Sequence, residues 1–113
     1  MPLIKTIASA KKKKGVYTIT VPVSNPNNSE VNTVDVSIND EGQPTATPNP
    51  VILTFDSTSG EDRIFKGTFN FSENAVGLQY PMTATMKDAA NEQIARKKTQ
   101  EVTIQAAKVP TEA

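Results

Sequence analysis

Apolar and polar residues alternate along short stretches of this chain between residues 16 and 105, and Pro, Gly and Asn separate the stretches. Successive side chains of a β-strand point to opposite faces, so an alternation with a period of two predicts a strand with one buried face. The clearest stretch is Val16–Ser24, whose apolar odd-numbered residues are Tyr17, Ile19, Val21 and Val23. Short strands separated by frequent turn residues are typical of an antiparallel β-sandwich.

The pattern predicts an all-β domain of about seven strands. We expect these strands at Leu3–Ala10, Val16–Ser24, Val31–Asn39, Val51–Asp56, Arg63–Phe71, Leu78–Lys87 and Ile94–Gln105. The segments Lys11–Gly15 and Ser57–Asp62 are predicted to be turns, and Asp40–Pro50 is predicted to be the longest loop, because it is rich in Gly, Pro and Thr.

Two segments fit the strand pattern less simply. Pro22 lacks the N–H group that a strand ladder needs, so we expect it at a sheet edge or beside a bulge. The last predicted strand has polar residues at the inward positions of its first half, which predicts a bulge there or a projection beyond the core. A helix over Asp88–Lys98 is the alternative, because the segment is rich in good helix formers, but it has no apolar stripe.

The predicted core centres on the fourth, fifth and sixth strands, where aromatic residues share the inward face. Its members are Phe55, Phe65, Phe69, Phe71, Tyr80 and Met82. Gly67 lies among these phenylalanines and is expected to leave space between their rings. Tyr17 also has inward parity, so both tyrosines are interpreted as structural residues and not as exposed platforms for sugar rings.

Composition excludes several kinds of chemistry. The 113 residues contain no His, Cys or Trp, so a thiolate nucleophile, an imidazole base and a soft metal ligand are all missing. A chain of this length can bury a core without disulfides. We therefore expect a protein that is not an enzyme and that needs no cofactor or metal ion.

Charge and hydropathy argue against two further classes of partner. Twelve Lys and Arg residues balance twelve Asp and Glu residues, which argues against a dedicated nucleic-acid binder. No apolar stretch approaches the roughly 20 residues that span a bilayer, so no membrane partner is expected. The segment Met1–Lys5 lacks the features of a secretory signal, which predicts synthesis in the cytoplasm.

Acidic residues offer two further hypotheses. Oxygen ligands for Ca²⁺ could come from Asp35, Asn39, Asp40, Glu41, Asp56, Glu61 and Asp62. These residues lack the regular ligand spacing of an EF-hand loop, and ordinary turn chemistry explains them as well. Glu73 and Asp88 could be imagined as the carboxylate pair of a glycosidase, but nothing in the sequence indicates the cleft that such a pair needs.

The run Lys11, Lys12, Lys13 and Lys14 is the one charge cluster of the sequence. It could form a basic tip that contacts an acidic protein surface, a phosphate or a lipid headgroup. The simpler interpretation, which we favour, is a solvated hairpin end whose lysines discourage edge-to-edge aggregation.

One segment resembles a known family. Gly77–Asn91, with the sequence GLQYPMTATMKDAAN, resembles the penultimate strand and the following turn of bacterial immunoglobulin-like and fibronectin type III-like modules. The resemblance implies that Tyr80 is their corner tyrosine, with its ring in the core and its hydroxyl bonded to the backbone. It also implies that residues 1–113 form a single immunoglobulin-like domain, with residues 1–7 as an N-terminal arm or edge strand and residues 106–113 as a C-terminal tail. The turn departs from the family because Asn91 has no Gly before it, and the Cys-Trp-Cys signature of antibody domains is absent.

The resemblance suggests a structural or accessory protein that docks on a larger assembly. Small immunoglobulin-like proteins made in the cytoplasm resemble the head-decoration proteins of tailed phages, so capsid or other virion proteins are the expected partners, with self-association as a further option and the virion surface as the location. The expected contact residues are the lysine run together with Pro2, Leu3, Ile4 and Val109. The alternatives are a carbohydrate or cell-surface adhesion module, which would use the loops Asp40–Pro50 and Ser57–Asp62, and an accessory domain cut from a longer enzyme.

Overall fold

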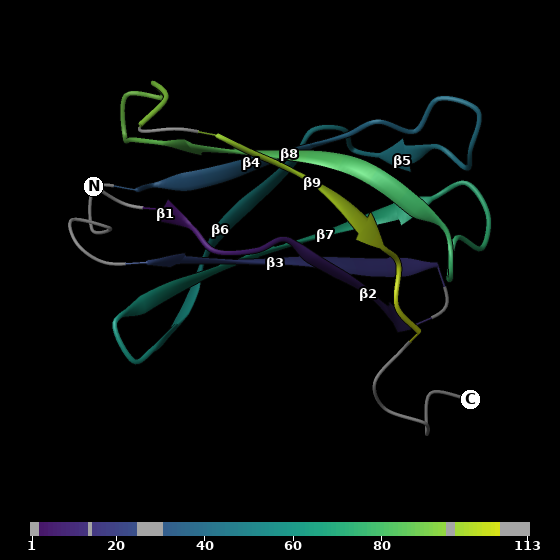
Figure 1. The fold of residues 1–113 in the computed structure, drawn as a ribbon, viewed down its shortest axis with the longest axis horizontal. Helices are drawn as coiled ribbons and strands as arrows, with labels where there is room; N and C mark the ends of the chain where they lie inside the picture. Colours follow the sequence, from purple (N-terminus) through teal and green to yellow (C-terminus); the bar gives the residue numbers. More distant parts are fainter. Residues whose placement is uncertain (1–2, 14, 25–30, 95–96, 107–113) are drawn as a thin grey trace.

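The computed structural model describes residues 3–13, 15–24, 31–94 and 97–106, and this part of the chain forms β-strands and turns without a helix (Figure 1). The strands are β1 (Leu3–Ile4), β2 (Ala8–Lys13), β3 (Val16–Ser24), β4 (Thr33–Ile38), β5 (Ala46–Thr47), β6 (Val51–Ser59), β7 (Asp62–Phe71), β8 (Gln79–Lys87) and β9 (Lys98–Thr103). The predicted all-β class is confirmed.

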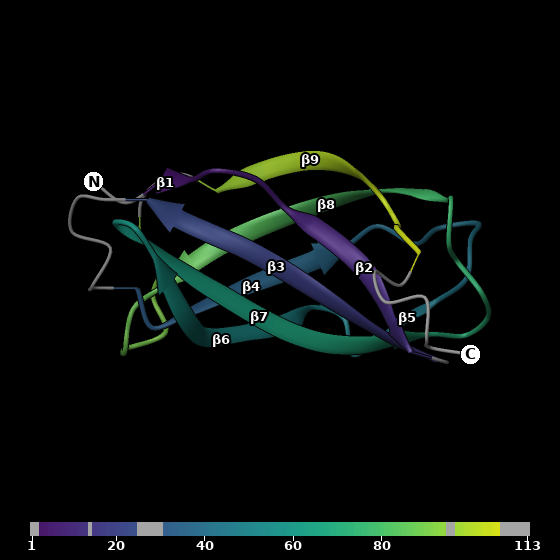
Figure 2. The ribbon, with the colours of Figure 1, turned by 90° about the horizontal axis from the view of Figure 1, so that it is seen from below.

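The strands form the two layers of an immunoglobulin-like sandwich (Figures 1 and 2). Neighbouring strands follow the order β1-β3-β7-β6-β4-β8-β9, with β2 paired to β3 and β5 paired to β7. One layer contains β1, β2, β3 and β7, and the other contains β4, β8 and β9. The order β1-β3-β7-β6 followed by β4-β8-β9 is that of the two sheets of a constant-type immunoglobulin domain.

Strand β6 joins the two layers because its halves pair with different strands. Residues Val51–Thr54 pair with β4, and Thr54–Ser59 pair with β7, with a shift of register between Phe55 and Ser57. In Figure 1 the strand runs diagonally from the layer of β4 and β8 to a hairpin with β7. Gly67 of β7 permits this crossing, since a Cβ atom there would lie 2.9 Å from the Ile52 carbonyl oxygen.

The core lies between the layers and follows the alternation of the sequence. Every second residue of β3, β4 and β8 is buried, including all four predicted inward residues of β3. Five members of the predicted aromatic core are also buried, namely Phe65, Phe69, Phe71, Tyr80 and Met82. The strand ladders pair backbone N–H with C=O groups between neighbouring strands, and the inward side chains fill the space between the layers.

The prediction that Phe55 belongs to the core is wrong, because its side chain is 47% exposed. It has inward parity and pairs with the buried Phe65. Strand β4 begins at Thr33, however, and Thr33 pairs with Thr54, so Phe55 lies past the end of the facing strand. Parity alone buries a side chain only where another layer covers it.

Two predicted turns are shorter than expected. The segment Ser57–Asp62 is mainly strand, because β6 continues to Ser59 and β7 begins at Asp62, with Gly60 at a φ of 62° between them. Gly tolerates this left-handed conformation because it has no side chain. The run Lys11–Lys13 also extends β2, and the predicted loop Asp40–Pro50 contains the short strand β5.

The segment before β9 is neither the predicted strand nor the alternative helix where the structure describes it. The Asp88 carboxylate accepts hydrogen bonds from the N–H groups of Ala90 and Glu92 at 2.9 and 3.0 Å, which makes a turn. The N–H group of Ile94 then donates to the Met86 carbonyl oxygen. Strand β9 begins only at Lys98.

Pro22 lies in a strand that is paired on both sides, so the prediction of an edge position is wrong. Its neighbours are Ile64 on β7 and the chain between β1 and β2 on the other side. The Pro22 carbonyl oxygen accepts a hydrogen bond from the Lys5 N–H group at 3.1 Å. The N–H and C=O groups of one residue in an antiparallel ladder point to the same side, so the ring nitrogen of Pro22 also faces this break between β1 and β2. The proline is tolerated because the neighbouring strand is interrupted there.

Side-chain amides take the place of a neighbouring strand at two positions, beside Ile7 and beside Ile38 beyond the end of the β4–β6 pairing. The Gln100 amide accepts from the Ile7 N–H group at 3.1 Å and donates to the Ile7 carbonyl oxygen at 2.9 Å. Asn49 does the same for Ile38, at 2.9 and 2.7 Å. We call these pairs of bonds amide clasps. They satisfy the peptide groups that a strand edge would leave open.

Candidate functional site

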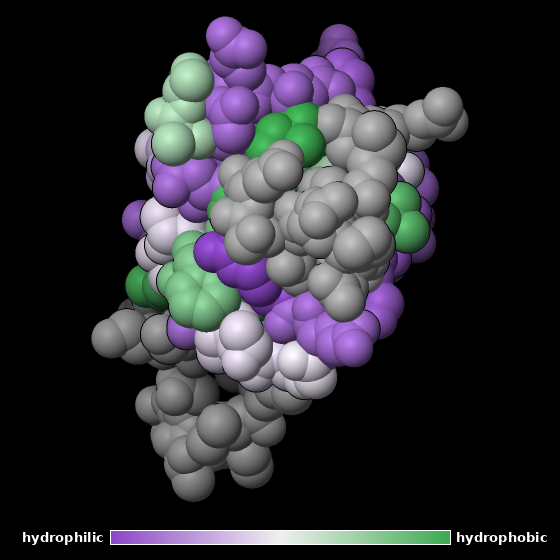
Figure 3. Space-filling model, turned by 90° about the vertical axis from the view of Figure 1, so that its left-hand side faces the viewer, coloured by the Kyte–Doolittle hydropathy of each residue, from purple (hydrophilic) through white to green (hydrophobic). Residues whose placement is uncertain are grey.

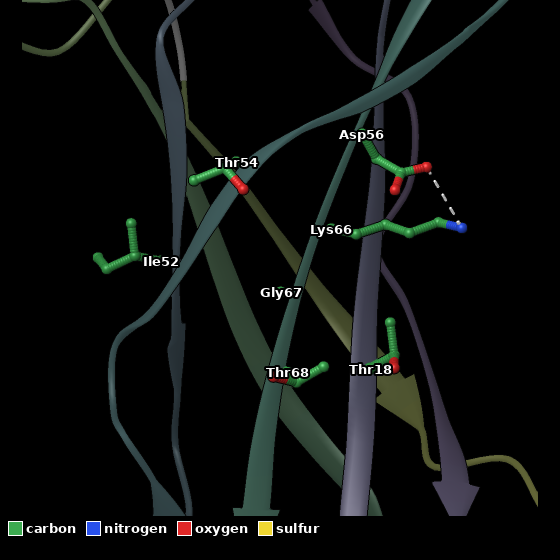
Figure 4. Close-up of a pocket in the computed structure, with 7 residues that line it drawn as sticks. All are labelled: Thr18, Ile52, Thr54, Asp56, Lys66, Gly67 and Thr68. Atoms are coloured by element: carbon green, nitrogen blue, oxygen red, sulfur yellow. Dashed lines mark ion pairs between the residues drawn. The ribbon is translucent and has the colours of Figure 1, made fainter.

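A shallow hollow lies on the outer surface where β6 leaves β7 (Figure 4). Its lining residues are Thr18, Ile52, Thr54, Asp56, Lys66, Gly67 and Thr68. In Figure 4 these side chains surround Gly67, with the Asp56–Lys66 ion pair on one side and Ile52 on the other. The hollow exists because β6 and β7 separate beyond the Thr54–Lys66 pair, so that the outward side chains of the two strands no longer lie side by side.

The hollow combines hydroxyl groups, one apolar side chain and one ion pair. Lys66 Nζ lies 3.6 Å from Asp56 Oδ2, and both side chains are well exposed, so the pair contributes little to stability. Three threonine hydroxyls can donate and accept hydrogen bonds. This set of groups can recognise a polar ligand or a peptide.

The end of the β6–β7 hairpin carries a second group of interest. The Arg63 guanidinium lies 4.8 Å from the ring centre of Phe55 and 5.1 Å from that of Phe65, and its Nη1 donates to the Val31 carbonyl oxygen at 2.8 Å. Arginine and aromatic side chains are enriched among the residues that dominate the energy of protein interfaces. Figure 3, which looks at this end of the molecule, shows hydrophobic residues as separate patches among hydrophilic ones.

A third feature is an apolar hollow between β1 and the start of β9. It is lined by Leu3, Ile4, Lys97, Lys98 and Thr99. Leu3 is 60% exposed, whereas the Ile4 side chain is buried. The hollow therefore has an apolar floor and a basic rim.

The structure places only some of the predicted contact residues. Lys11 pairs with Tyr17 and Lys13 with Val16 in the ladder of β2 and β3, so the lysine run lies in a strand and not wholly in a turn. Leu3 is exposed, and Ile4 and Ile7 are core residues, so the predicted N-terminal arm packs against the sandwich. Lys14, Pro2 and Val109 lie outside the described residues. Partner binding by this set stays a prediction.

Three acidic residues of the calcium hypothesis are engaged elsewhere. Asp35 lies 3.2 Å from Lys87 and Asp62 lies 2.8 Å from Lys5, whereas Asp40 Oδ2 accepts a hydrogen bond from the Ala46 N–H group at 2.9 Å. Within the described ranges, no three acidic side chains gather so that they could hold a metal ion.

Both tyrosines act as structural residues. The Tyr80 hydroxyl donates to the Pro44 carbonyl oxygen at 3.2 Å, which ties the loop before β5 to the core. The Tyr17 hydroxyl accepts from the Ala75 N–H group at 3.2 Å. Burial raises the pKa of Tyr80 above its ordinary value, and the negative charge of Asp40 raises it further.

The hollows could not be found from the sequence. The first depends on the path of β6 and on Gly67, whose place in an alternating pattern indicates only a missing side chain. The second depends on the distance between two strands that lie at opposite ends of the chain. No helix in the described part of the chain is long and apolar enough to cross a membrane.

No family model and no curated protein matches the sequence. Among solved structures, the fold is similar to that of murine CRIg, with 11% identity, a TM-score of 0.43 and coverage of 93% of this chain and 98% of that chain. It is also similar to a cohesin module from a family 33 glycoside hydrolase of Clostridium perfringens, with 13% identity, a TM-score of 0.38 and coverage of 93% and 96%.

Proposed function

We propose that this protein is a non-enzymatic structural module that docks on a larger protein assembly, and that the assembly is a virion on whose surface it is a decoration protein. The observation that carries the docking role is the exposure of large apolar side chains on a small sandwich. Leu3, Ile52 and Phe55 are 60%, 49% and 47% exposed, respectively. Exposure of such side chains to water is unfavourable, and covering them with a partner stabilises the complex.

The formal net charge of zero supports the same proposal. A chain without a large net charge is not repelled by copies of itself or by other neutral surfaces, which favours dense packing on a repetitive particle. The phage setting rests on the resemblance of Gly77–Asn91 to immunoglobulin-like modules. In this proposal the protein is made in the cytoplasm and then attaches to the particle.

The experiment is sedimentation of particles from cells that make the native protein. We expect the protein to migrate with intact particles in a density gradient and to be present in many copies per particle, as measured by quantitative mass spectrometry. A protein that stays at the top of the gradient when particles are intact would reject the decoration role. Cells that make no particle containing the protein would reject it as well.

A second candidate function is recognition of a carbohydrate, and the hollow at Gly67 favours it. Threonine hydroxyls and the Asp56–Lys66 pair offer the hydrogen-bonding groups that sugar hydroxyls need. The hollow has no aromatic ring among its lining residues on which a sugar could stack. A glycan array would separate the two functions, because a docking module should give no saturable signal on it.

A further inference from the structure

The seam between the N-terminal strands and β9 is closed at one end and open at the other. At the closed end Ala10 and Gln105 form a parallel bridge, and the Gln105 N–H group donates to the Ser9 carbonyl oxygen at 3.1 Å. In the middle, the Gln100 clasp spans the seam to Ile7. At the open end lies the apolar hollow between β1 and the start of β9. The distance between the N-terminal strands and β9 therefore increases from the closed end to the open end.

Peptide groups of both strands point into the open end. Neighbouring residues of an antiparallel ladder direct their N–H and C=O groups to opposite sides. The Ile104 N–H group donates to the carbonyl oxygen of Leu78, on the side of β8, whereas the N–H group of the next residue, Gln105, donates across the seam. The peptide groups of odd-numbered residues in this strand therefore point into the seam, and those of Thr99 are among them. Lys5 donates to β3, so those of its neighbour Ile4 point the other way, toward β9. The described part of the chain supplies no hydrogen-bond partner for either across the seam.

The side chains around the open end define the chemistry of an occupant. Ile4 forms an apolar floor, and Leu3 is the most exposed of the large hydrophobic residues that the structure describes. Lys97 and Lys98 put positive charge at the rim, and neither appears in an ion pair in this part of the structure. An occupant that complements this site has an apolar side chain for the floor and acidic side chains for the rim.

We propose that this hollow receives an extended segment of a partner protein, in which apolar and acidic residues alternate, and that the segment adds a short strand between β1 and β9. Strands β1 and β2 are both antiparallel to β3, and Ala10 of β2 forms a parallel bridge with Gln105 after β9, so one inserted strand can be antiparallel to both β1 and β9. The inference rests on the proposed docking function and names its site. The edges span only a few residues, so a single site binds weakly, and firm attachment comes from many copies on a repetitive surface.

The experiment titrates the protein with a blocked synthetic peptide of about eight residues in which valine and glutamate alternate. Nuclear magnetic resonance follows the backbone amides at peptide concentrations up to about a millimolar, the range suited to weak complexes. We expect saturable shifts of the Leu3, Ile4 and Thr99 amides. A peptide with lysine in place of glutamate, and one with the valines and glutamates in separate blocks, should each bind at least about tenfold more weakly.

A matched pair of variants tests strand addition. Thr99→Pro removes the N–H group that points into the seam, whereas Thr99→Val keeps it and removes only the side-chain hydroxyl. We expect about a tenfold loss of peptide binding for the first and little change for the second, with both variants folded by circular dichroism. A Lys97→Glu, Lys98→Glu double variant should prefer the lysine peptide, whereas Lys66→Glu, in the other hollow, should leave binding unchanged.

Several results would overturn the inference. They are the absence of seam shifts with the glutamate peptide, equal binding by the Thr99→Pro and Thr99→Val variants, and seam shifts on raising the protein concentration alone, which would make a second copy the occupant. A Thr99→Pro protein that loses the peptide but sediments with particles as the native protein does would reject the seam as the docking site and leave the proposed function standing. Native protein that binds the peptide at the seam but never sediments with particles would reject the proposed function instead.

Discussion

The two aromatic groups of this sandwich differ in what covers them. Tyr17, Phe69, Phe71 and Tyr80 form a buried cluster in which successive ring centres lie 4.8 to 5.8 Å apart. At the hairpin end, Phe55 and Phe65 lie 6.1 Å apart at an interplanar angle of 75°, and only Phe65 is buried. Both groups come from strands with the same alternation. The facing layer makes the difference, because it covers the cluster and ends before Phe55.

The comparison teaches that identical parity can serve two purposes. In the cluster, inward rings hold the two layers together and bring tyrosine hydroxyls to backbone groups of the loops. At the hairpin end, the same parity presents a ring to solvent and stacks it with Arg63. The first arrangement serves stability, and the second leaves a surface that a partner can cover.

The largest expected effect comes from Phe69 in the cluster. Replacing it with Ala removes a buried ring between Tyr17 and Phe71 and leaves a cavity, so we expect a loss of about 3–5 kcal/mol in the free energy of unfolding. Denaturant titration measures this loss. A change below about 1 kcal/mol would mean that the cluster is no more important than the hairpin end and would remove the contrast.

Gly67 tests the point at which β6 departs from β7. An added Cβ atom would lie 2.9 Å from the Ile52 backbone oxygen and 3.2 Å from Val51 Cγ1, so the two strands must separate in Gly67→Ala. We expect a loss of about 1–3 kcal/mol, the range of an overpacked core. Thr68→Ala, at the neighbouring exposed position, is the control and should change the free energy of unfolding by less than about 0.5 kcal/mol.

Tyr80→Phe removes one hydroxyl from the cluster while keeping its ring. We expect a loss of about 0.5–1.5 kcal/mol, because the hydrogen bond to Pro44 disappears. Burial raises the pKa of Tyr80 above 10.0, so the hydroxyl stays protonated to a higher pH in the folded state than in the unfolded state. The native protein should therefore lose stability as the pH rises above about 10, and Tyr80→Phe should weaken this dependence. If the free energy of unfolding of Tyr80→Phe depends on pH as that of the native protein does, other groups cause the loss of stability at alkaline pH.

Phe55→Ala should have the smallest effect on folding. Its ring is half exposed, so the variant loses partial burial and one exposed cation–π contact, together about 1 kcal/mol or less. Thermal and denaturant unfolding measure this loss. A loss comparable with that of Phe69→Ala would show that the hairpin end is a second core and not an open surface.

The sequence predicted the features that depend on alternation within one strand. Strand β3 has the predicted bounds Val16–Ser24, and its inward residues are all buried. Tyr80 has its ring in the core and its hydroxyl on a backbone oxygen, as the family resemblance implied. Such features are local, since parity and turn residues are written in neighbouring positions.

The features that the sequence did not predict depend on residues far apart in the chain. Phe55 is exposed because β4, about twenty residues earlier, begins opposite Thr54, and no pattern within β6 records this. The lysine run looked like a turn, but pairing with Val16 and Tyr17 extends β2 through Lys13. Neither hollow was predictable, because each is a space between strands whose separation only the assembled sheets define.

The shared strand β6 has a consequence for how the molecule unfolds. Because Val51–Thr54 belong to one layer and Thr54–Ser59 to the other, the pairing continues from the first layer into the second through Thr54, which pairs with both β4 and β7. Releasing either layer breaks the ladder of the other, so the layers cannot open independently. Slow amide hydrogen exchange should therefore report one global opening for β4 and β7 alike, and a partly open form that retains a single layer should not accumulate.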